Sequence, residues 1–150
     1  MVPGHECRGC RSFEVMAGHS EAQDIRRLDR DECYQLLRRR TLGRVAVHIG
    51  ADITILPVYY ALMDDDVVFR TAPGVKLDAA VLKSRVAFEV DNGNPPWSVL
   101  VHGYAEELRD KQLQTQARAR LPSDWPAGER ERLVRIQVDS VSGRRLVPAS

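Results

Sequence analysis

The stretch from Ile53 to Leu77 decides the fold, and its sequence is ITILPVYYALMDDDVVFRTAPGVKL. The segment Ile53–Met63 predicts a long strand. Both of its faces are apolar, with Ile53, Ile55, Tyr59 and Ala61 on one side and Leu56, Val58, Tyr60 and Leu62 on the other. A strand of this kind is buried on both sides. The aspartates 64–66 predict a turn, and Val67–Thr71 predicts the next strand. A small barrel has only one interior, so the outer face of the long strand must meet a ligand, a helix or a second subunit.

The segments before this stretch predict a helix and a short strand. Asp29-Arg30-Asp31-Glu32 has the pattern of a capping box, with Asp29 as the N-cap and Glu32 reaching back to it. We expect the helix to continue through the basic run Arg38-Arg39-Arg40 and to end at Gly43. A short strand, Arg44–Ile49, follows.

The segments after this stretch predict three more strands, at Arg85–Val90, Trp97–Leu108 and Val134–Val138. Short helices are expected after the Pro73-Gly74 turn, around Leu113–Leu121 and at Ala127–Leu133. The loop Asn92–Pro96 is made of turn formers. Six strands closed by hairpins indicate a mainly β fold, a small antiparallel barrel with helices at its rim.

The composition fits one domain and excludes several classes of partner. The chain has 150 residues, with 22 basic and 21 acidic side chains, so its balance gives no reason to expect binding to nucleic acid or to a membrane surface. No apolar run is long enough to span a bilayer, and the first residues lack the apolar core of a signal peptide. We therefore expect a cytoplasmic protein with reduced cysteines.

Residues 1–27 show no steady apolar period, and we expect a flexible tail before a domain that covers residues 28–150. Within this tail, His5, Cys7, Cys10 and His19 are permissible zinc ligands. No second pair of ligands follows at the spacing of a zinc finger. A tail without metal is therefore the favoured interpretation, and a zinc site remains the alternative.

The segment Phe69–Leu77 carries the strongest chemical signal, because a strand ends, a Pro-Gly turn follows and a helix starts there. The N-terminus of a helix attracts anions. Arg70, Thr71 and Lys76 can add two charges and a hydroxyl donor around one phosphate. The alternative is an ordinary connection with exposed cations.

These segments together resemble the pyridoxamine 5′-phosphate oxidase-like family of FMN-binding split barrels. The resemblance runs from Leu28 to about Leu108 and more loosely to Val147. It includes Gly43-Arg44-Val45-Ala46, Leu56-Pro57-Val58-Tyr59-Tyr60, Val67–Leu77, Val86–Asp91 and Trp97–Ala105. It implies a six-stranded antiparallel split β-barrel that binds FMN between the two subunits of a homodimer.

The resemblance also implies roles for individual residues. Arg70, Thr71 and Lys76 would hold the FMN phosphate. The strand with Pro57, Val58 and Tyr59 would lie against the isoalloxazine ring, mainly through its backbone, and Trp97 and Ser98 would approach the ring from the next long strand. Pro95-Pro96 stands where related chains usually have glycine. The segment Ser142–Val147 lacks the Arg-x-His signature of true pyridoxamine-phosphate oxidases, so oxidation of vitamin B6 is not expected.

The expected function is that of an FMN-dependent oxidoreductase, which passes electrons from a reduced nicotinamide or deazaflavin to a small-molecule substrate. No obligatory catalytic side chain is evident; His48 and His102 are the proton-donor candidates within the barrel, and each is more often an ordinary surface histidine. One alternative is a reductase that uses the deazaflavin F420, whose acidic tail could meet Arg38-Arg39-Arg40. Another is a protein that binds flavin or haem without turnover.

Overall fold

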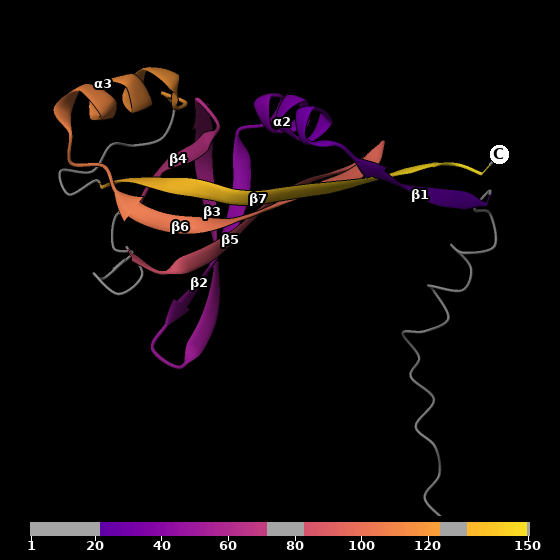
Figure 1. Ribbon diagram of the computed structural model, residues 1–150, viewed down its shortest axis with the longest axis horizontal. Coiled ribbons are helices and arrows are strands. Elements are labelled where there is room, and N and C mark those ends of the chain that lie inside the picture. Colours follow the sequence, from indigo (N-terminus) through magenta and orange to yellow (C-terminus); the bar gives the residue numbers. More distant parts are fainter. Residues whose placement is uncertain (1–21, 72–82, 124–131, 150) are drawn as a thin grey trace, which may run out of the picture.

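The computed structural model describes residues 22–71, 83–123 and 132–149, and these residues form one antiparallel sheet closed on itself. The seven strands are β1 (Gln23–Leu28), β2 (Leu42–Ile49), β3 (Asp52–Met63), β4 (Asp66–Arg70), β5 (Arg85–Gly93), β6 (Pro96–Glu107) and β7 (Leu133–Pro148). Their order is β1-β7-β4-β3-β2-β5-β6, and a further pairing of β7 with β6 closes six of them into a ring (Figure 1). The prediction of a mainly β, six-stranded antiparallel split barrel is confirmed.

The described part also contains two helices, α2 (Arg30–Arg38) and α3 (Lys111–Arg120), which lie on either side of the end of β3 (Figure 1). Neither is long and apolar enough to cross a membrane. The helix expected after Pro73-Gly74 and most of the one expected at Ala127–Leu133 lie outside the described residues. Leu133 itself begins β7.

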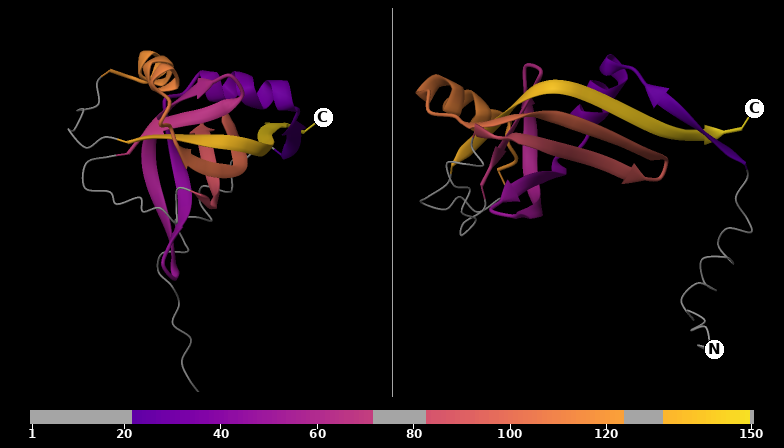
Figure 2. Two further views of the ribbon diagram at one scale, coloured as in Figure 1. Left: turned by 60° about the vertical axis from the view of Figure 1, so that its left-hand side comes forward. Right: turned by 60° about the horizontal axis from the view of Figure 1, so that its bottom comes forward.

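Strands β1 and β7 differ most from the sequence-based expectation. β7 was predicted to end at Val138 but continues to Pro148, and residues 23–27, assigned to the tail, belong to β1. The two strands pair from Gln23↔Pro148 to Leu28↔Gly143 and extend beyond the ring as an arm (Figure 2). The arm carries mostly charged and polar side chains, so backbone pairing forms it without the apolar period that marks a strand. The predicted tail is thus too long at its C-terminal end, and residues 1–21 lie outside the described part.

Helix α2 begins as predicted. The Asp29 side chain accepts a hydrogen bond from the Glu32 N–H, and the Glu32 side chain accepts one from the Asp29 N–H, each at 2.9 Å. The helix buries Cys33, Tyr34, Leu36 and Leu37 on its barrel-facing side.

The prediction that Gly43 ends this helix is wrong, because α2 ends at Arg38 with Arg39 as its C-cap. Gly43 lies in β2 and faces the interior, where a Cβ atom would stand 2.4 Å from Cζ of the buried Phe88 ring. The glycine is therefore required by close packing of two strands, and not by a helix terminus.

We expect Asp29→Ala to lower the free energy of unfolding by about 1 kcal/mol, because the variant leaves the Glu32 N–H without its acceptor. The same measurement by chemical denaturation on Asp31→Ala is the control, since Asp31 is exposed in the same turn and outside the box. Equal losses in both variants would contradict the role of the box.

The Asp29 N–H and Arg26 hold the pKa of Glu32 below its usual value. The contribution of Glu32 is therefore present at neutral pH and is lost as the pH falls through this lowered pKa.

Two separate cores stabilise the barrel. The larger fills the ring and the space beneath α2, with Tyr60 and Phe88 in an edge-to-face contact at 5.0 Å between ring centroids. The smaller lies under α3, where Ala117 and Leu121 cover Met63, Val68 and Leu133 on the outside of the ring. Helix α3 thus covers only one part of the outer face of the sheet.

The rest of the outer face, on β2, β3, β5 and β6, has no cover among the described residues. Strand residues directly opposite each other share a face, and the register aligns Ile55 with Ala46, Ala46 with Ala87, and Ala87 with His102. Ile53 and Ile55 are 69% and 64% exposed. The predicted outer apolar face of this strand is present, and the barrel itself leaves it bare.

Candidate functional site

The alternation along β3 separates the residues that were expected to meet a ring. Pro57 lies opposite Arg44 and is exposed, and Tyr59 lies opposite Leu42 and is half-buried, so both point to the outer face. Val58 lies opposite Gly43 and points into the core. The outer face of β3 therefore carries the side chains of Pro57 and Tyr59, whereas Val58 can contribute only backbone atoms to a site on that face.

Arg70 lies beside this face of β3. Its preceding residue, Phe69, pairs with Tyr60 and points inward with it, so Arg70, at the end of β4, points to the same outer side as Tyr59. Arg70 pairs with Leu133, which belongs to the core under α3. It stands where the covered part of the outer face meets the bare part.

Thr71 is only 6% exposed and binds β7. Its N–H donates to the Arg132 carbonyl at 2.9 Å, and its Oγ1 accepts from the Arg132 N–H at 3.1 Å. A hydroxyl that accepts one hydrogen bond still has its proton to donate, and no donation by Thr71 Oγ1 is found among the described residues. Lys76, the third expected phosphate ligand, lies outside the described residues.

The two expected residues of β6 are separated by the same alternation. The Trp97 indole is 8% exposed and packs in the larger core, whereas Ser98 lies opposite Asp91 and points outward. In the sheet, β2 and β5 stand between β3 and β6. The structure thus brings together Pro57, Tyr59 and Arg70, and one chain alone does not place Ser98 beside them.

The turn before Trp97 is shorter than expected. β5 continues to Gly93 and β6 starts at Pro96, so the predicted loop Asn92–Pro96 reduces to Asn94 and Pro95, joined by a cis peptide bond. Asn92 Nδ2 donates to the carbonyl oxygens of Asn94 and Pro95. After this hairpin Trp97 lies opposite Asn92, and its side chain is buried.

A charged cluster on the outer face was not predicted as part of a site. Arg44 Nη1 lies 3.0 Å from Glu89 Oε2 and 3.5 Å from Asp91 Oδ1. Burial and the neighbouring Asp91 raise the pKa of Glu89. Because Arg44 also lies opposite Pro57, this cluster borders the residues that were expected to bind the ring. The partners of Arg44 follow from the register, which places it opposite Glu89.

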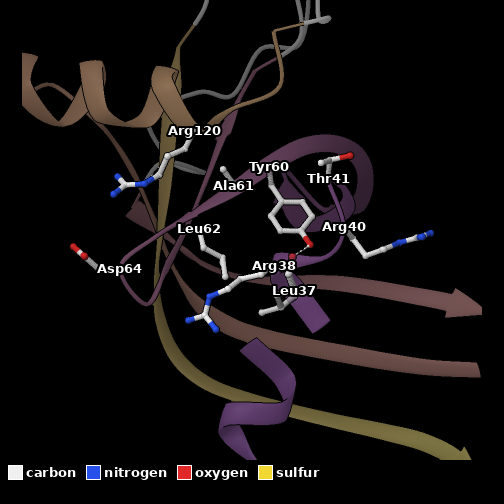
Figure 3. A pocket seen from close by; sticks show the side chains of 9 residues that line it. All are labelled: Leu37, Arg38, Arg40, Thr41, Tyr60, Ala61, Leu62, Asp64 and Arg120. Carbon is white, nitrogen blue, oxygen red and sulfur yellow. Dashed lines mark hydrogen bonds between the residues drawn. The ribbon is translucent and has the colours of Figure 1, made fainter. Parts of the chain in front are cut away.

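A cleft of about 420 Å³ opens beside Tyr60–Leu62 at the end of β3, between α2 and α3 (Figure 3). Its apolar wall consists of Leu37, Tyr60, Ala61 and Leu62. Arg38 and Arg40 line it from the end of α2, and Arg120 from the end of α3, and Asp64 and Thr41 complete the lining. The sequence indicated the basic end of α2, but no local pattern could show that Arg120 faces it.

Comparison with known proteins gives one family and several relatives. Residues 29–145 match the family model described as pyridoxamine 5′-phosphate oxidase. The uncharacterized protein Rv0080 of Mycobacterium tuberculosis is 34% identical over 143 residues, which cover 89% of this chain and 93% of that protein.

Two similar solved structures are of proteins described as FAD-binding. A FAD-binding protein from Mycobacterium smegmatis is 32% identical with a TM-score of 0.71, covering 80% of this chain and 97% of that one. A FAD-binding protein from Mesorhizobium loti is 29% identical with a TM-score of 0.71, covering 84% of this chain and 99% of that one.

Proposed function

The chain belongs to the pyridoxamine 5′-phosphate oxidase family, and we propose that it is a homodimeric flavoprotein that binds FMN and works as an oxidoreductase. It would pass electrons from a reduced nicotinamide or deazaflavin to a small-molecule acceptor. The observation that carries the proposal is the common outer placement of Pro57, Tyr59 and Arg70. The two relatives described as FAD-binding support a flavin as the ligand.

The residues present fit a flavin nucleotide. Arg70 supplies a cation and Thr71 a hydroxyl donor at the end of β4, as a phosphate requires. Beside them, Pro57, Tyr59 and the half-exposed Leu42 form an apolar surface suited to a flat ring. When bound, the flavin supplies two-electron redox chemistry.

The backbone of β3 can recognise the edge of such a ring. β4 pairs with β3 only from Tyr60 to Met63, and the earlier part of β3 is paired with β2 alone among the described strands. One edge of β3 before Tyr60 can therefore offer backbone groups to a ligand. At Pro57 this edge offers a carbonyl and no N–H, so the ligand must present a donor there.

A second subunit would complete this site. The bare outer face holds Pro57 and Tyr59 at one end and Ser98 at the other. A two-fold axis through such a face places each of these ends of one subunit against the surface of its partner. The proposal is that Ser98 of the partner subunit approaches the ring and that the interface excludes water from it.

The absorption spectrum of the purified chain tests the proposal. A two-band flavin spectrum that is bleached by NADPH, with subsequent turnover of an acceptor, supports the oxidoreductase. A flavin spectrum without turnover would indicate a flavin carrier, and a Soret band would indicate a haem-binding protein. A colourless chain that binds F420 would indicate an F420-dependent reductase. Chromatography of the released cofactor, with titration of the apoprotein, decides between FMN and FAD.

Arg70→Gln is expected to weaken FMN binding by about 1.5–3 kcal/mol, roughly 10- to 150-fold, the range for a hydrogen bond to a charged group. Lys76→Ala should weaken it by a similar amount. Arg118→Gln, a change of the same charge at an exposed position of α3, is the control. Fluorescence titration of the apoproteins measures the affinities, and their melting temperatures show whether each variant is folded. Unchanged affinity in folded Arg70→Gln would remove the phosphate assignment.

A further inference from the structure

The cleft at the end of β3 gathers positive charge from two separate elements (Figure 3). Arg38 is the last residue of α2, Arg40 follows its C-cap, and Arg120 is the last residue of α3. Asp64 is the single carboxylate among the lining residues, so they carry a net charge of two positive units. Arg38 and Arg120 extend toward the Asp64 side of the cleft and Arg40 toward the opposite side (Figure 3). Like charges around one cleft repel, and a bound anion would lower this repulsion.

None of these three guanidinium groups is in an ion pair with any residue that the structure describes. Other arginines nearby have partners, such as Arg30, which lies 3.4 Å from Asp65. The fixed fork of a guanidinium matches carboxylate and phosphate groups. The cleft therefore offers donors that the described part of the fold does not use in ion pairs.

The backbone of β3 adds a donor at the floor of the cleft. The Tyr60 N–H donates to the Thr41 carbonyl at 2.9 Å, so alternation directs the Leu62 N–H to the same edge. β2 begins at Leu42, opposite Tyr59, and no described strand continues along this edge beyond it. This edge of β3 is thus open beside the cleft that Arg38, Arg40 and Arg120 line.

The remaining lining sets the body of the ligand. Leu37, Ala61 and Leu62 are apolar, and the Tyr60 hydroxyl already donates to the Leu37 carbonyl. A volume of about 420 Å³ lies within the range of small-molecule sites. The lining matches a compact molecule with an acidic head and an apolar or aromatic body.

We propose that this cleft is a second ligand site, which binds an organic dianion such as a phosphate monoester or a dicarboxylate. The proposed flavin lies elsewhere. Arg70 stands on the β4 side of β3, whereas the cleft opens on the β2 side beyond Tyr60. The inference does not rest on flavin binding, because its donors are residues that the flavin site does not include.

Calorimetric titration with two probes tests the site. Phenyl phosphate and benzene-1,2-dicarboxylate represent the two head groups, and benzyl alcohol is the neutral control. Wild type is compared with the double variant Arg40→Gln/Arg120→Gln. The matched control is Arg39→Gln/Arg118→Gln, which removes the same charge from the same two elements at positions that do not line the cleft.

We expect wild type and the control variant to bind an anionic probe with similar affinity, and the cleft variant to bind it about 100-fold more weakly. Binding of only one of the two probes supports the site and identifies its head group. Equal weakening in both double variants, equal binding of benzyl alcohol, or no binding of either anion at millimolar concentration would overturn the proposal.

A parallel titration separates this inference from the proposed flavin site. Saturation with FMN should leave probe binding unchanged. Displacement of the probe by FMN, with loss of FMN affinity in Arg40→Gln/Arg120→Gln, would assign the cleft to the flavin and overturn a second site. If the chain binds no flavin but the cleft variant still binds the anionic probe more weakly than the control variant, the cleft site stands and the proposed function is wrong.

Discussion

Gly103→Ala is expected to lower the free energy of unfolding by about 3 kcal/mol or more, the upper range for overpacking. A Cβ atom at this position would lie 2.1 Å from the Gln137 carbonyl oxygen, 2.9 Å from its carbon and 2.9 Å from Cγ2 of the fully buried Ile136. The obstacle is mainly backbone, so no side-chain rotation can relieve it. The pairing of β6 with β7 would have to shift.

The location of Gly103 makes this shift costly. The β6–β7 pairing closes the ring, and its register already changes between His102 and Gly103. Gly93→Ala is the matched control, because Gly93 ends a strand and a Cβ there meets nothing within 4 Å. We expect the control to change stability by no more than about 0.5 kcal/mol. Chemical denaturation of both variants measures the difference, and a Gly103→Ala chain as stable as the control would contradict the close approach.

The elements that could be predicted from sequence are those with a local cause. The capping box depends on Asp29 and Glu32, which lie within one turn, so its residues could be read directly. The two apolar faces of β3 follow from alternation within one strand. The family resemblance supplied the split-barrel architecture, because hairpin order alone does not fix how a sheet closes.

The elements that were missed depend on contacts between distant segments. Gly43 resembles a helix terminator in sequence, and only its pairing with β3 and its close approach to Phe88 of β5 show why glycine is needed there. β1 has no apolar period, and it is held in place by its backbone pairing with the end of β7. A polar two-stranded arm gives no hydrophobic signal, so propensity alone places its residues in a tail.

The candidate site shows the same division. Arg70 and Pro57, to which the family resemblance gives the phosphate and the ring, lie on one outer face because a local hairpin joins their strands. The sequence could not show that Trp97 points into the core and Ser98 outward, since a one-residue change of register reverses both. That Arg120 lines the cleft follows from the position of α3 relative to β3, which no local sequence pattern shows.

The bare outer face is the surface on which we expect the second subunit to dock. Leu42, Ile53, Ile55 and Leu100 are exposed large apolar side chains on it. The first three lie together on β2 and β3, and Leu100 lies on β6 beyond the Arg44–Glu89 ion pair. Exposed apolar patches on folded chains mark interaction sites. A two-fold dimer covers such a face with a second copy of itself, and it would bring the two flavin sites to the interface.

Ile55→Asp is expected to raise the dimer dissociation constant roughly a thousand-fold or more, and to lower the flavin content in parallel. Each interface contains the substitution twice, and removing a carboxylate from water costs several kcal/mol per copy. Folding should be preserved, because Ile55 is 64% exposed in the single chain. Sedimentation equilibrium gives the dissociation constant, absorbance gives the flavin per chain, and circular dichroism shows that the variant is folded.

Gln112→Asp is the control for this substitution. Gln112 is exposed in the first turn of α3, away from the bare face, where an added negative charge suits the N-terminus of the helix. This variant should remain a dimer with its full flavin content. If folded Ile55→Asp also stays dimeric, the subunits associate through another surface. A wild-type chain that is monomeric at micromolar concentration and still carries one flavin per chain would remove both the interface and the shared site, because Pro57, Tyr59 and Arg70 of one subunit would then suffice to hold the ligand.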